Sequence, residues 1–206
     1  MFKRLVVITF MATITILFTS SSYAVDVDLL NETIHGQPIS SKLSFYMEKY
    51  GQPDKNNNNY MVDYYKSNGF FLYVDTKTGL VSDFSAYFSD YDPSNPEKVP
   101  SGTTAFKGNA SFGIRKGATF NNVFDKLRAE FTGRACAMIG PGMVYYGGAP
   151  KNYKMKVIIL QLKQGAAIIS FDENDIVAYL NVVLDRDYWD RIGGSHNLGN
   201  FLSWHN

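Results

Sequence analysis

The sequence has very little cysteine. Cys136 is the single cysteine among 206 residues, which excludes a fold held together by disulfides within the chain, because each disulfide needs two thiols. An unpaired cysteine can be buried, reactive or joined to another chain. Cys136 lies between Ala135 and Ala137 and is followed by Met138 and Ile139, a setting that favours burial as a small hydrophobic residue.

An excess of charge of either sign is also missing. The chain has 20 Lys and Arg against 19 Asp and Glu, a formal net charge of +1. Nucleic-acid binding calls for a basic stripe that neutralises phosphates, so we expect no nucleic-acid partner. Beyond residue 24 no stretch is long and apolar enough to cross a bilayer.

The one long apolar run lies at the start of the chain. Lys3 and Arg4 precede the apolar stretch Leu5–Phe18, and Ser22-Tyr23-Ala24 follows. This order is typical of a secretory signal peptide over residues 1–24. An uncleaved anchor is the alternative, but the stretch is short for a membrane span and contains three threonines. We therefore expect a periplasmic or secreted protein.

The signatures of common catalytic and metal sites are missing too. There is no Gly-x-Ser-x-Gly elbow and no phosphate-binding glycine loop. His35, His196 and His205 lack the spacing of a helical zinc pair. A Cys136–His196 nucleophile pair is conceivable, but no nucleophile signature surrounds the cysteine. We expect no enzyme, no catalytic residue, no metal and no cofactor.

What the sequence does contain is a repeated layout. Gly36 and Gly117 each precede apolar residues spaced by three or four, which is one face of an α-helix. The matched positions are Ile39 with Phe120, Leu43 with Phe124, Tyr46 with Leu127 and Tyr50 with Phe131. Gly51 and Pro53 are a stop signal for the first helix, and Thr119 is a plausible N-cap for the second.

Each predicted helix is followed by β-rich runs. Residues 70–75 align with 167–172, and residues 80–84 align with 176–180. Short polar turns separate the runs, so each pair is a predicted hairpin. An earlier strand precedes each hairpin, at Tyr60–Lys66 and at Lys156–Lys163, and Met143–Tyr146 is a candidate extra edge strand.

This layout is similar to that of a known family. A helix that opens after Gly-x-Thr, closes near Gly-x-Pro and leads into an antiparallel meander resembles the SmpA/OmlA type of small bacterial envelope protein. Two such units in one secreted chain resemble the beta-lactamase inhibitory protein architecture. The chain departs from both patterns, because it has no lipobox cysteine and cannot form the disulfides of the inhibitory protein.

The predicted fold is therefore α+β, with two tandem units that each consist of a helix followed by an antiparallel meander. Together they would form a concave sheet with the helices on one face. The expected divisions are the signal peptide 1–24, a first unit 25–88, a linker 89–112, a second unit 113–184 and an aromatic C-terminal arm 185–206.

The expected linker is rich in proline, serine and glycine, which predicts a solvated connection. Asp90, Asp92, Ser94 and Asn95 offer oxygen ligands as calcium loops do. The glycine and terminal glutamate of an EF-hand loop are missing, so a linker is favoured.

Strand alternation divides the predicted sheet into two faces. The face under the helices would hold Leu72, Val74, Leu80, Phe84, Phe88, Ile169, Phe171, Ile176, Leu180 and Leu184. The other face would hold Asp63, Tyr65, Phe71, Tyr73, Val81, Asp83, Tyr87, Ile159, Ile168, Val177, Tyr179 and Val183. The second set is too apolar for a bare sheet, so that face is either an interface or covered by the tail, the 132–155 loop or the other unit.

These features and the resemblance together predict a non-enzymatic protein-binding protein of inhibitor or immunity type, whose partner is an envelope or secreted enzyme. An envelope-assembly or scaffold component is the alternative, and a small-ligand binder comes third. The predicted partner-binding residues are Tyr65, Phe71, Tyr73, Tyr87, Tyr145, Tyr146 and Tyr179.

The first testable prediction concerns the leader. We expect the mature protein to begin at Val25, because Ser22-Tyr23-Ala24 is a small-x-small cleavage site. Intact-mass measurement of the protein from the periplasmic fraction checks this. A mass that retains residues 1–24, or one that carries a lipid, would contradict the prediction.

Overall fold

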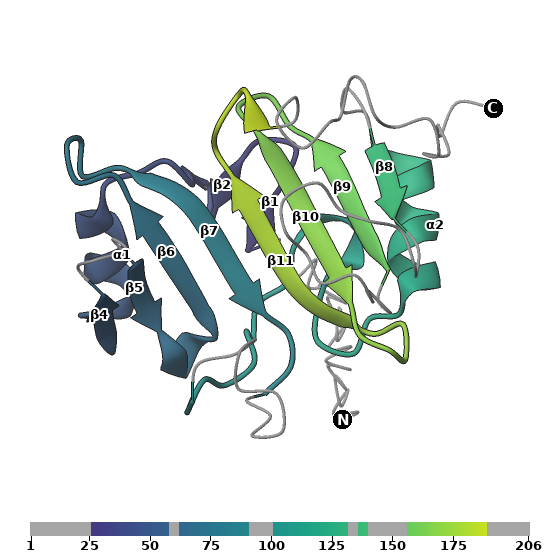
Figure 1. The fold of residues 1–206 in the computed structure, drawn as a ribbon, viewed down its shortest axis with the longest axis horizontal. Coiled ribbons are helices and arrows are strands. Elements are labelled where there is room, and N and C mark those ends of the chain that lie inside the picture. Colours follow the sequence, from purple (N-terminus) through teal and green to yellow (C-terminus); the bar gives the residue numbers. More distant parts are fainter. Residues whose placement is uncertain (1–25, 58–61, 91–100, 132–135, 140–155, 189–206) are drawn as a thin grey trace, which may run out of the picture.

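The computed structural model describes residues 26–57, 62–90, 101–131, 136–139 and 156–188 (Figure 1). Within these residues the protein is α+β, with two α-helices and two antiparallel sheets. One sheet has three short strands and the other has eight. The predicted signal peptide and most of the predicted C-terminal arm lie outside the described residues.

The large sheet has the strand order β4-β5-β6-β7-β11-β10-β9-β8. Every neighbouring pair is antiparallel. Its strands are β4 (Lys55–Asn57), β5 (Val62–Tyr65), β6 (Phe70–Val74), β7 (Val81–Tyr87), β8 (Cys136–Ile139), β9 (Val157–Gln161), β10 (Ala166–Phe171) and β11 (Val177–Val183). The predicted β6–β7 and β10–β11 hairpins are confirmed.

The two ends of this sheet were predicted less well. The first edge strand, β4, lies in the asparagine-rich stretch that has no alternating pattern. The other edge strand, β8, begins at Cys136; the side chain of this cysteine lies outside the described part of the chain. The candidate edge strand Met143–Tyr146 lies there too.

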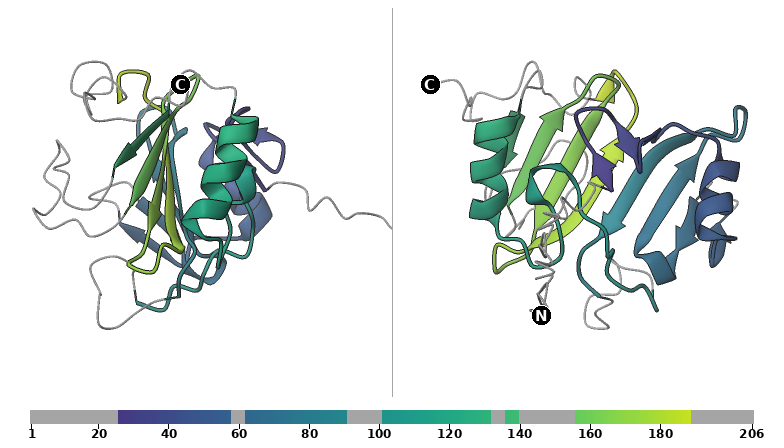
Figure 2. Two further views of the ribbon diagram at one scale, coloured as in Figure 1. Left: turned by 90° about the vertical axis from the view of Figure 1, so that its right-hand side faces the viewer. Right: turned by 180° about the vertical axis from the view of Figure 1, so that it is seen from behind.

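Both helices lie on the same face of the large sheet (Figure 2). They are α1 (Leu43–Tyr50) and α2 (Phe120–Glu130). Thr119 is confirmed as the N-cap of α2, since its side chain accepts a hydrogen bond from Asn122 N at 3.3 Å. Gly51 ends α1 with a positive φ of 82°, which only glycine adopts without strain.

The predicted alignment of the two helices is wrong by four residues. Leu43 N donates to Gly79 O at the turn before β7, and Phe120 N donates to Asp175 O at the turn before β11. Leu43 therefore makes at the start of α1 the contact that Phe120 makes at the start of α2, whereas the prediction paired Leu43 with Phe124. Because four residues are about one helical turn, the shift leaves the apolar faces matched and the sequence pattern cannot detect it.

Between the helices lies the small sheet formed by the N-terminal segment (Figure 2). Its strands are β1 (Val27–Asp28), β2 (Thr33–Ile34) and β3 (Gln37–Pro38). Leu29, Ile34 and Ile39 are fully buried. Buried Glu32 accepts a hydrogen bond from Gln164 N at 2.7 Å, which ties this segment to the β9–β10 turn. Two-residue strands carry no periodicity, so the sequence does not predict this sheet.

Both hairpins contain a β-bulge at the same place. In the first hairpin Tyr73 pairs with Asp83 and Val74 pairs with Val81, so Ser82 is an extra residue. In the second hairpin Ser170 pairs with Tyr179 and Phe171 pairs with Val177, so Ala178 is extra. An extra residue reverses the alternation of faces along the rest of the strand.

The bulges correct several predicted face assignments. Val81 and Val177 are buried in the core under the helices, although simple alternation put them on the other face. Leu80, predicted as core, is 38% exposed, and Ile176 is half-buried outside the core cluster. The other eight predicted core residues are confirmed as buried in this core or packed against it: Leu72, Val74, Phe84, Phe88, Ile169, Phe171, Leu180 and Leu184.

Tyr65 was also assigned to the wrong face. It pairs with Phe70, and Asp63 pairs with Leu72, so both lie on the helix side. The short 3₁₀ helix Lys66–Asn68 joins β5 to β6 and breaks the alternation that the prediction carried across it. The Tyr65 ring stacks on Phe70 at 4.7 Å and is 1% exposed.

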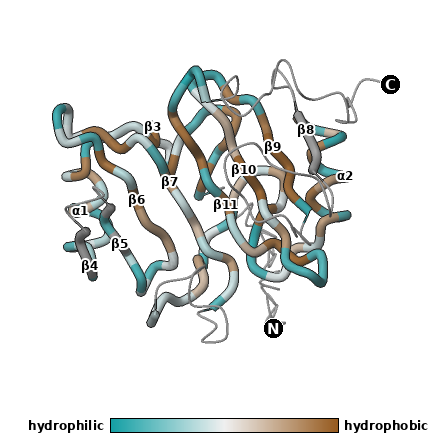
Figure 3. Tube along the Cα trace, viewed as in Figure 1, coloured by the Kyte–Doolittle hydropathy of each residue, from teal (hydrophilic) through white to brown (hydrophobic). Residues whose placement is uncertain are grey.

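The core runs without a break beneath both helices. Under α1, the Phe70 ring lies 4.9 Å from Tyr50 and 5.5 Å from Phe84. Under α2, Phe120 meets Phe171 edge-on at 5.1 Å. Figure 3 shows the matching hydropathy, with apolar strand interiors and polar hairpin turns. One buried cluster includes residues of both halves.

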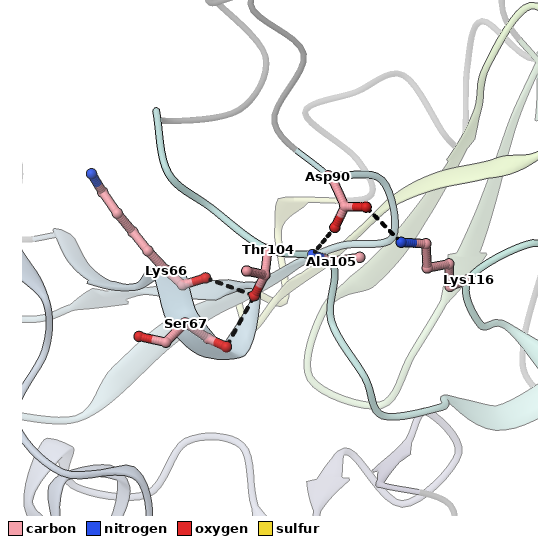
Figure 4. Close-up of polar contacts among 6 residues, drawn as sticks. All are labelled: Lys66, Ser67, Asp90, Thr104, Ala105 and Lys116. Carbon is pink, nitrogen blue, oxygen red and sulfur yellow. Dashed lines mark hydrogen bonds and ion pairs between the residues drawn. The ribbon is translucent and has the colours of Figure 1, made fainter.

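The second part of the predicted linker is packed rather than solvated. Ala105 and Phe106 are buried, and Phe106 N donates to Tyr87 O. Figure 4 shows Thr104 Oγ1 donating to the carbonyl oxygens of Lys66 and Ser67 at 3.2 and 2.9 Å. The linker was predicted from its glycine and proline content. The apolar side chains of Ala105 and Phe106 nevertheless favour burial of this segment.

Asp90 helps to fix this segment. Its carboxylate accepts a hydrogen bond from Ala105 N at 2.9 Å and pairs with Lys116 at 2.7 Å (Figure 4). The other three candidate calcium ligands, Asp92, Ser94 and Asn95, lie outside the described residues.

The close packing of Gly69 generates a prediction. It has φ +77°, and an added Cβ would clash with the backbone N of Phe106 and lie 2.5 Å from Thr104 O. We expect Gly69→Ala to lower the free energy of unfolding by about 4 kcal/mol or more. Gly79→Ala is the control, because Gly79 has φ +68° with no atom within 4 Å and should lose only about 1–2 kcal/mol. Denaturant unfolding followed by circular dichroism measures both, and equal losses would contradict the packing.

The buried tyrosine hydroxyls under α1 generate another prediction. Tyr65 Oη has no hydrogen-bond partner among the described residues, whereas Tyr46 Oη donates to Ile39 O at 2.8 Å. Tyr65→Phe should therefore raise the free energy of unfolding by about 1 kcal/mol, and Tyr46→Phe should lower it by about as much. Thermal midpoints at pH 7 check the signs, and a loss in both variants would contradict the assignment.

The Tyr65→Phe variant can also be tested at alkaline pH. Burial raises the pKa of Tyr65 from 10.0 to about 12, so the folded state holds the phenol proton more tightly than the unfolded chain. This contribution to stability is complete below about pH 10 and is lost as the pH rises towards 12. Tyr65→Phe should lose less stability than the wild type across that window.

Candidate functional site

The candidate site lies on the face of the large sheet opposite the helices, which we call the outer face. Phe84 and Leu180 point into the core, so their strand neighbours point outward. Strand pairing arranges the outward residues in rows across the sheet. The central rows are Tyr73-Asp83-Val183, Phe71-Ser85-Asn181-Ile168 and Tyr87-Tyr179-Ser170.

Four aromatic side chains form a cluster at the centre of this face. We call Phe71, Tyr73, Tyr87 and Tyr179 the aromatic cluster. The Phe71 ring lies 5.6 Å from Tyr73, 5.5 Å from Tyr87 and 6.4 Å from Tyr179. Tyr87 and Tyr179 are 5.4 Å apart. These separations are those of favourable aromatic pairs, and the cluster spans β6, β7 and β11.

Two side-chain hydrogen bonds lie beside the aromatic cluster. Ser85 is fully buried, and its Oγ accepts hydrogen bonds from Tyr179 Oη at 2.8 Å and from Asn181 Nδ2 at 2.7 Å. Burial raises the pKa of Tyr179 far above its usual range, and the negative charge of Asp83 contributes in the same direction. The phenol therefore stays neutral and donates a hydrogen bond to Ser85 Oγ, which fixes the direction of the ring.

One carboxylate belongs to this surface. Asp83 pairs across the strands with Tyr73 and is half-buried. Its Oδ2 accepts a hydrogen bond from Ser82 Oγ at 2.7 Å. Burial raises the pKa of Asp83, and the nearby Asp185 raises it further. The group is thus an incompletely solvated carboxylate at the edge of an apolar surface.

Exposure differs sharply within the aromatic cluster. Tyr73 is 39% exposed, whereas Phe71 and Tyr87 are each 7% exposed. Tyr179 is half-buried. Tyr73 is therefore the member that a partner can reach most readily, and the Phe71 ring packs against it at 5.6 Å.

Of the predicted partner-binding residues, the structure brings Phe71, Tyr73, Tyr87 and Tyr179 together. It does not bring Tyr65 to them, because Tyr65 is in the core under α1. Tyr145 and Tyr146 lie outside the described residues.

Asp83, Ser85 and Asn181 were not predicted as site residues from the sequence. Their position between apolar core residues was the available signal, since a polar residue at every second strand position marks the outer face. Asp83 was placed on that face, but its value to the site comes from contacts that alternation does not reveal.

Other chemistries find less support in the described residues. There, no group of three or more His, Cys, Asp and Glu side chains could hold a metal ion. His35 pairs with Asp26 at 3.2 Å, and burial lowers the pKa of the imidazole; this pair anchors the N-terminal segment. Neither described helix is long and apolar enough to cross a membrane.

Comparison of the chain with known protein families, with curated proteins and with solved structures finds no match.

Proposed function

We propose that the protein is a secreted or periplasmic protein that binds another protein through its outer face, in the manner of an inhibitor or immunity protein. The observation that carries this proposal is the aromatic cluster. Four rings gather on the face that neither helix covers, and Tyr73 stands exposed at its edge.

The chemistry of tyrosine suits such a surface. Its ring gives a large, rigid apolar area, and its hydroxyl remains satisfied in water when no partner is bound. Tyrosine is for this reason enriched at the centres of interfaces, where a few residues supply most of the binding free energy. The Phe71 ring, 5.6 Å from that of Tyr73, restricts its motion, so less conformational entropy is lost on binding.

We also propose that the two halves of the sheet are tandem units, each a helix followed by a meander. The bulges at Ser82 and Ala178 occupy matching positions in the two hairpins. Matching bridges join Lys42 to Leu80 and Thr119 to Ile176, just before each helix. Independent origins would not be expected to reproduce these irregularities in the same places.

This arrangement supports the resemblance to the beta-lactamase inhibitory protein type. In both cases two helix-plus-sheet units would present one continuous sheet surface to a partner. The aromatic cluster lies across the boundary between the units here, because Phe71, Tyr73 and Tyr87 come from the first hairpin and Tyr179 from the second.

The test uses Tyr73→Ala. Tyr73 is exposed, so its truncation should change the free energy of unfolding by only about 0.5 kcal/mol, while an interface anchor should lose about 2 kcal/mol of binding free energy or more. Tyr87 and Tyr179 are poorer probes, because they are more buried and their truncation would mix stability with binding.

Leu80→Ala is the matched control. Leu80 is 38% exposed, nearly the same as Tyr73, but it lies just before β7 and is bridged to Lys42, the residue that precedes α1. The mature wild type, Tyr73→Ala and Leu80→Ala serve as parallel baits in affinity capture from periplasmic extract. We expect a protein that the wild type and Leu80→Ala retain and that Tyr73→Ala loses.

A captured enzyme is then assayed with and without each variant. Loss of its activity with the wild type, but not with Tyr73→Ala at the same concentration, is the inhibitor outcome. Capture that is the same for all three baits, or a Tyr73→Ala variant that fails to fold, would contradict the proposed role of the outer face.

A further inference from the structure

We propose that the outer face seats an arginine side chain of the partner, with its guanidinium against the Tyr73 ring and on the Asp83 carboxylate. This inference rests on the proposed function, since it names the chemistry that the same surface recognises. It is carried by the position of Asp83 beside the exposed ring and by the charges around it.

The first element is geometry. Tyr73 and Asp83 are direct partners on β6 and β7, so their side chains leave the sheet on the same face with Cβ atoms about 4.5–5.5 Å apart. Val183 is the partner of Asp83 on the other side, and its side chain is apolar and buried. A partner side chain that reaches the Asp83 carboxylate therefore passes along the face or edge of the Tyr73 ring.

The second element is charge complementarity. Ion pairs are seen at Asp26, Asp90 and Asp175, and none joins Asp83 to another residue that the structure describes. Within the described part of the chain, the Asp83 carboxylate accepts a hydrogen bond from the Ser82 hydroxyl and from no other group. An ionised carboxylate has about four acceptor positions on its two oxygens, so most of those of Asp83 remain for a donor from outside.

The residues around Asp83 also favour the binding of a cation there. Asp185 adds a second negative charge nearby, and Tyr73, Tyr179 and Tyr188 are further titratable groups around the site among the described residues. Burial disfavours the charged form of Asp83, and a cation placed beside it would offset that cost. Partial burial also makes such a pair stronger than one on an open surface.

The third element is the choice of cation. A guanidinium is planar, stacks on aromatic faces and presents paired donors that match a carboxylate. A lysine ammonium is more strongly hydrated and cannot make the paired contact. A site formed by one carboxylate and one exposed aromatic ring therefore favours arginine over lysine.

The experiment uses an array of random 12-residue peptides as the probe and the mature full-length chain as the receptor. Peptides that bind the wild type are compared with those that bind Asp83→Asn and Tyr73→Ala. The peptide that binds best is then resynthesised with each arginine replaced by lysine or by citrulline, which keeps the shape of arginine without its charge. Fluorescence anisotropy gives the dissociation constants.

We expect the selected peptides to be enriched in arginine. Asp83→Asn, and the citrulline replacement in the wild type, should each weaken binding at least about 10-fold, the lower end for loss of a close interfacial charge pair. Lysine should restore only part of the affinity. Asp125→Asn is the control, because Asp125 is an exposed carboxylate on α2 and should leave binding unchanged.

The failures of the two proposals are distinguishable. Peptides that depend on Tyr73 but bind Asp83→Asn as tightly as the wild type, or that contain no arginine, would overturn the arginine inference and leave protein binding in place. An array in which no bound peptide depends on Tyr73 would contradict the proposed function and this inference with it. A thermal midpoint for Asp83→Asn at or above that of the wild type shows that the variant is folded.

Discussion

The antiparallel pairing of β7 with β11 is the interaction on which the rest of the structure depends. It joins strands from the two hairpins over the five residue pairs from Tyr179–Tyr87 to Val183–Asp83 and makes one eight-stranded sheet (Figure 1). Because the pairing is continuous, one core extends beneath both helices. The same register sets Tyr87 opposite Tyr179 and places the aromatic cluster on the boundary between the halves.

The two bulges determine which side chains each face receives. Ser82 and Ala178 are the extra residues. Each directly follows a valine, Val81 or Val177, whose side chain is buried under the helices. Val81 and Val177 thereby reach the core while the next outward residues, Asp83 and Tyr179, reach the outer face. Without a bulge, one of these two sets would have to lie on the wrong side. The irregularity therefore serves the core and the candidate site together.

The outer face combines features that usually exclude one another. It contains closely packed rings and a buried serine that accepts two hydrogen bonds, as a core does, yet it also displays an exposed tyrosine and a carboxylate. A rigid apolar patch with one charge at its edge recognises shape through the rings and chemistry through the charge. The N-terminal segment and residues 101–112 add further buried contacts to the fold through Glu32, Ala105 and Phe106.

The sequence by itself determined the α+β class, the two hairpins, the cap at Thr119 and the end of α1 at Gly51, because each depends on residues that are close in the chain. It also placed Phe71, Tyr73, Tyr87 and Tyr179 on one face through the two-residue period of a strand. Only the tertiary structure decided the helix alignment, since a shift of one turn preserves the apolar face. The faces of Tyr65, Val81 and Val177 depend on a 3₁₀ connection and on bulges, which local periodicity does not encode. The meeting of the first hairpin with Tyr179, and of Ser85 with Asn181, depends on the β7–β11 register, which is set by packing between residues almost one hundred positions apart.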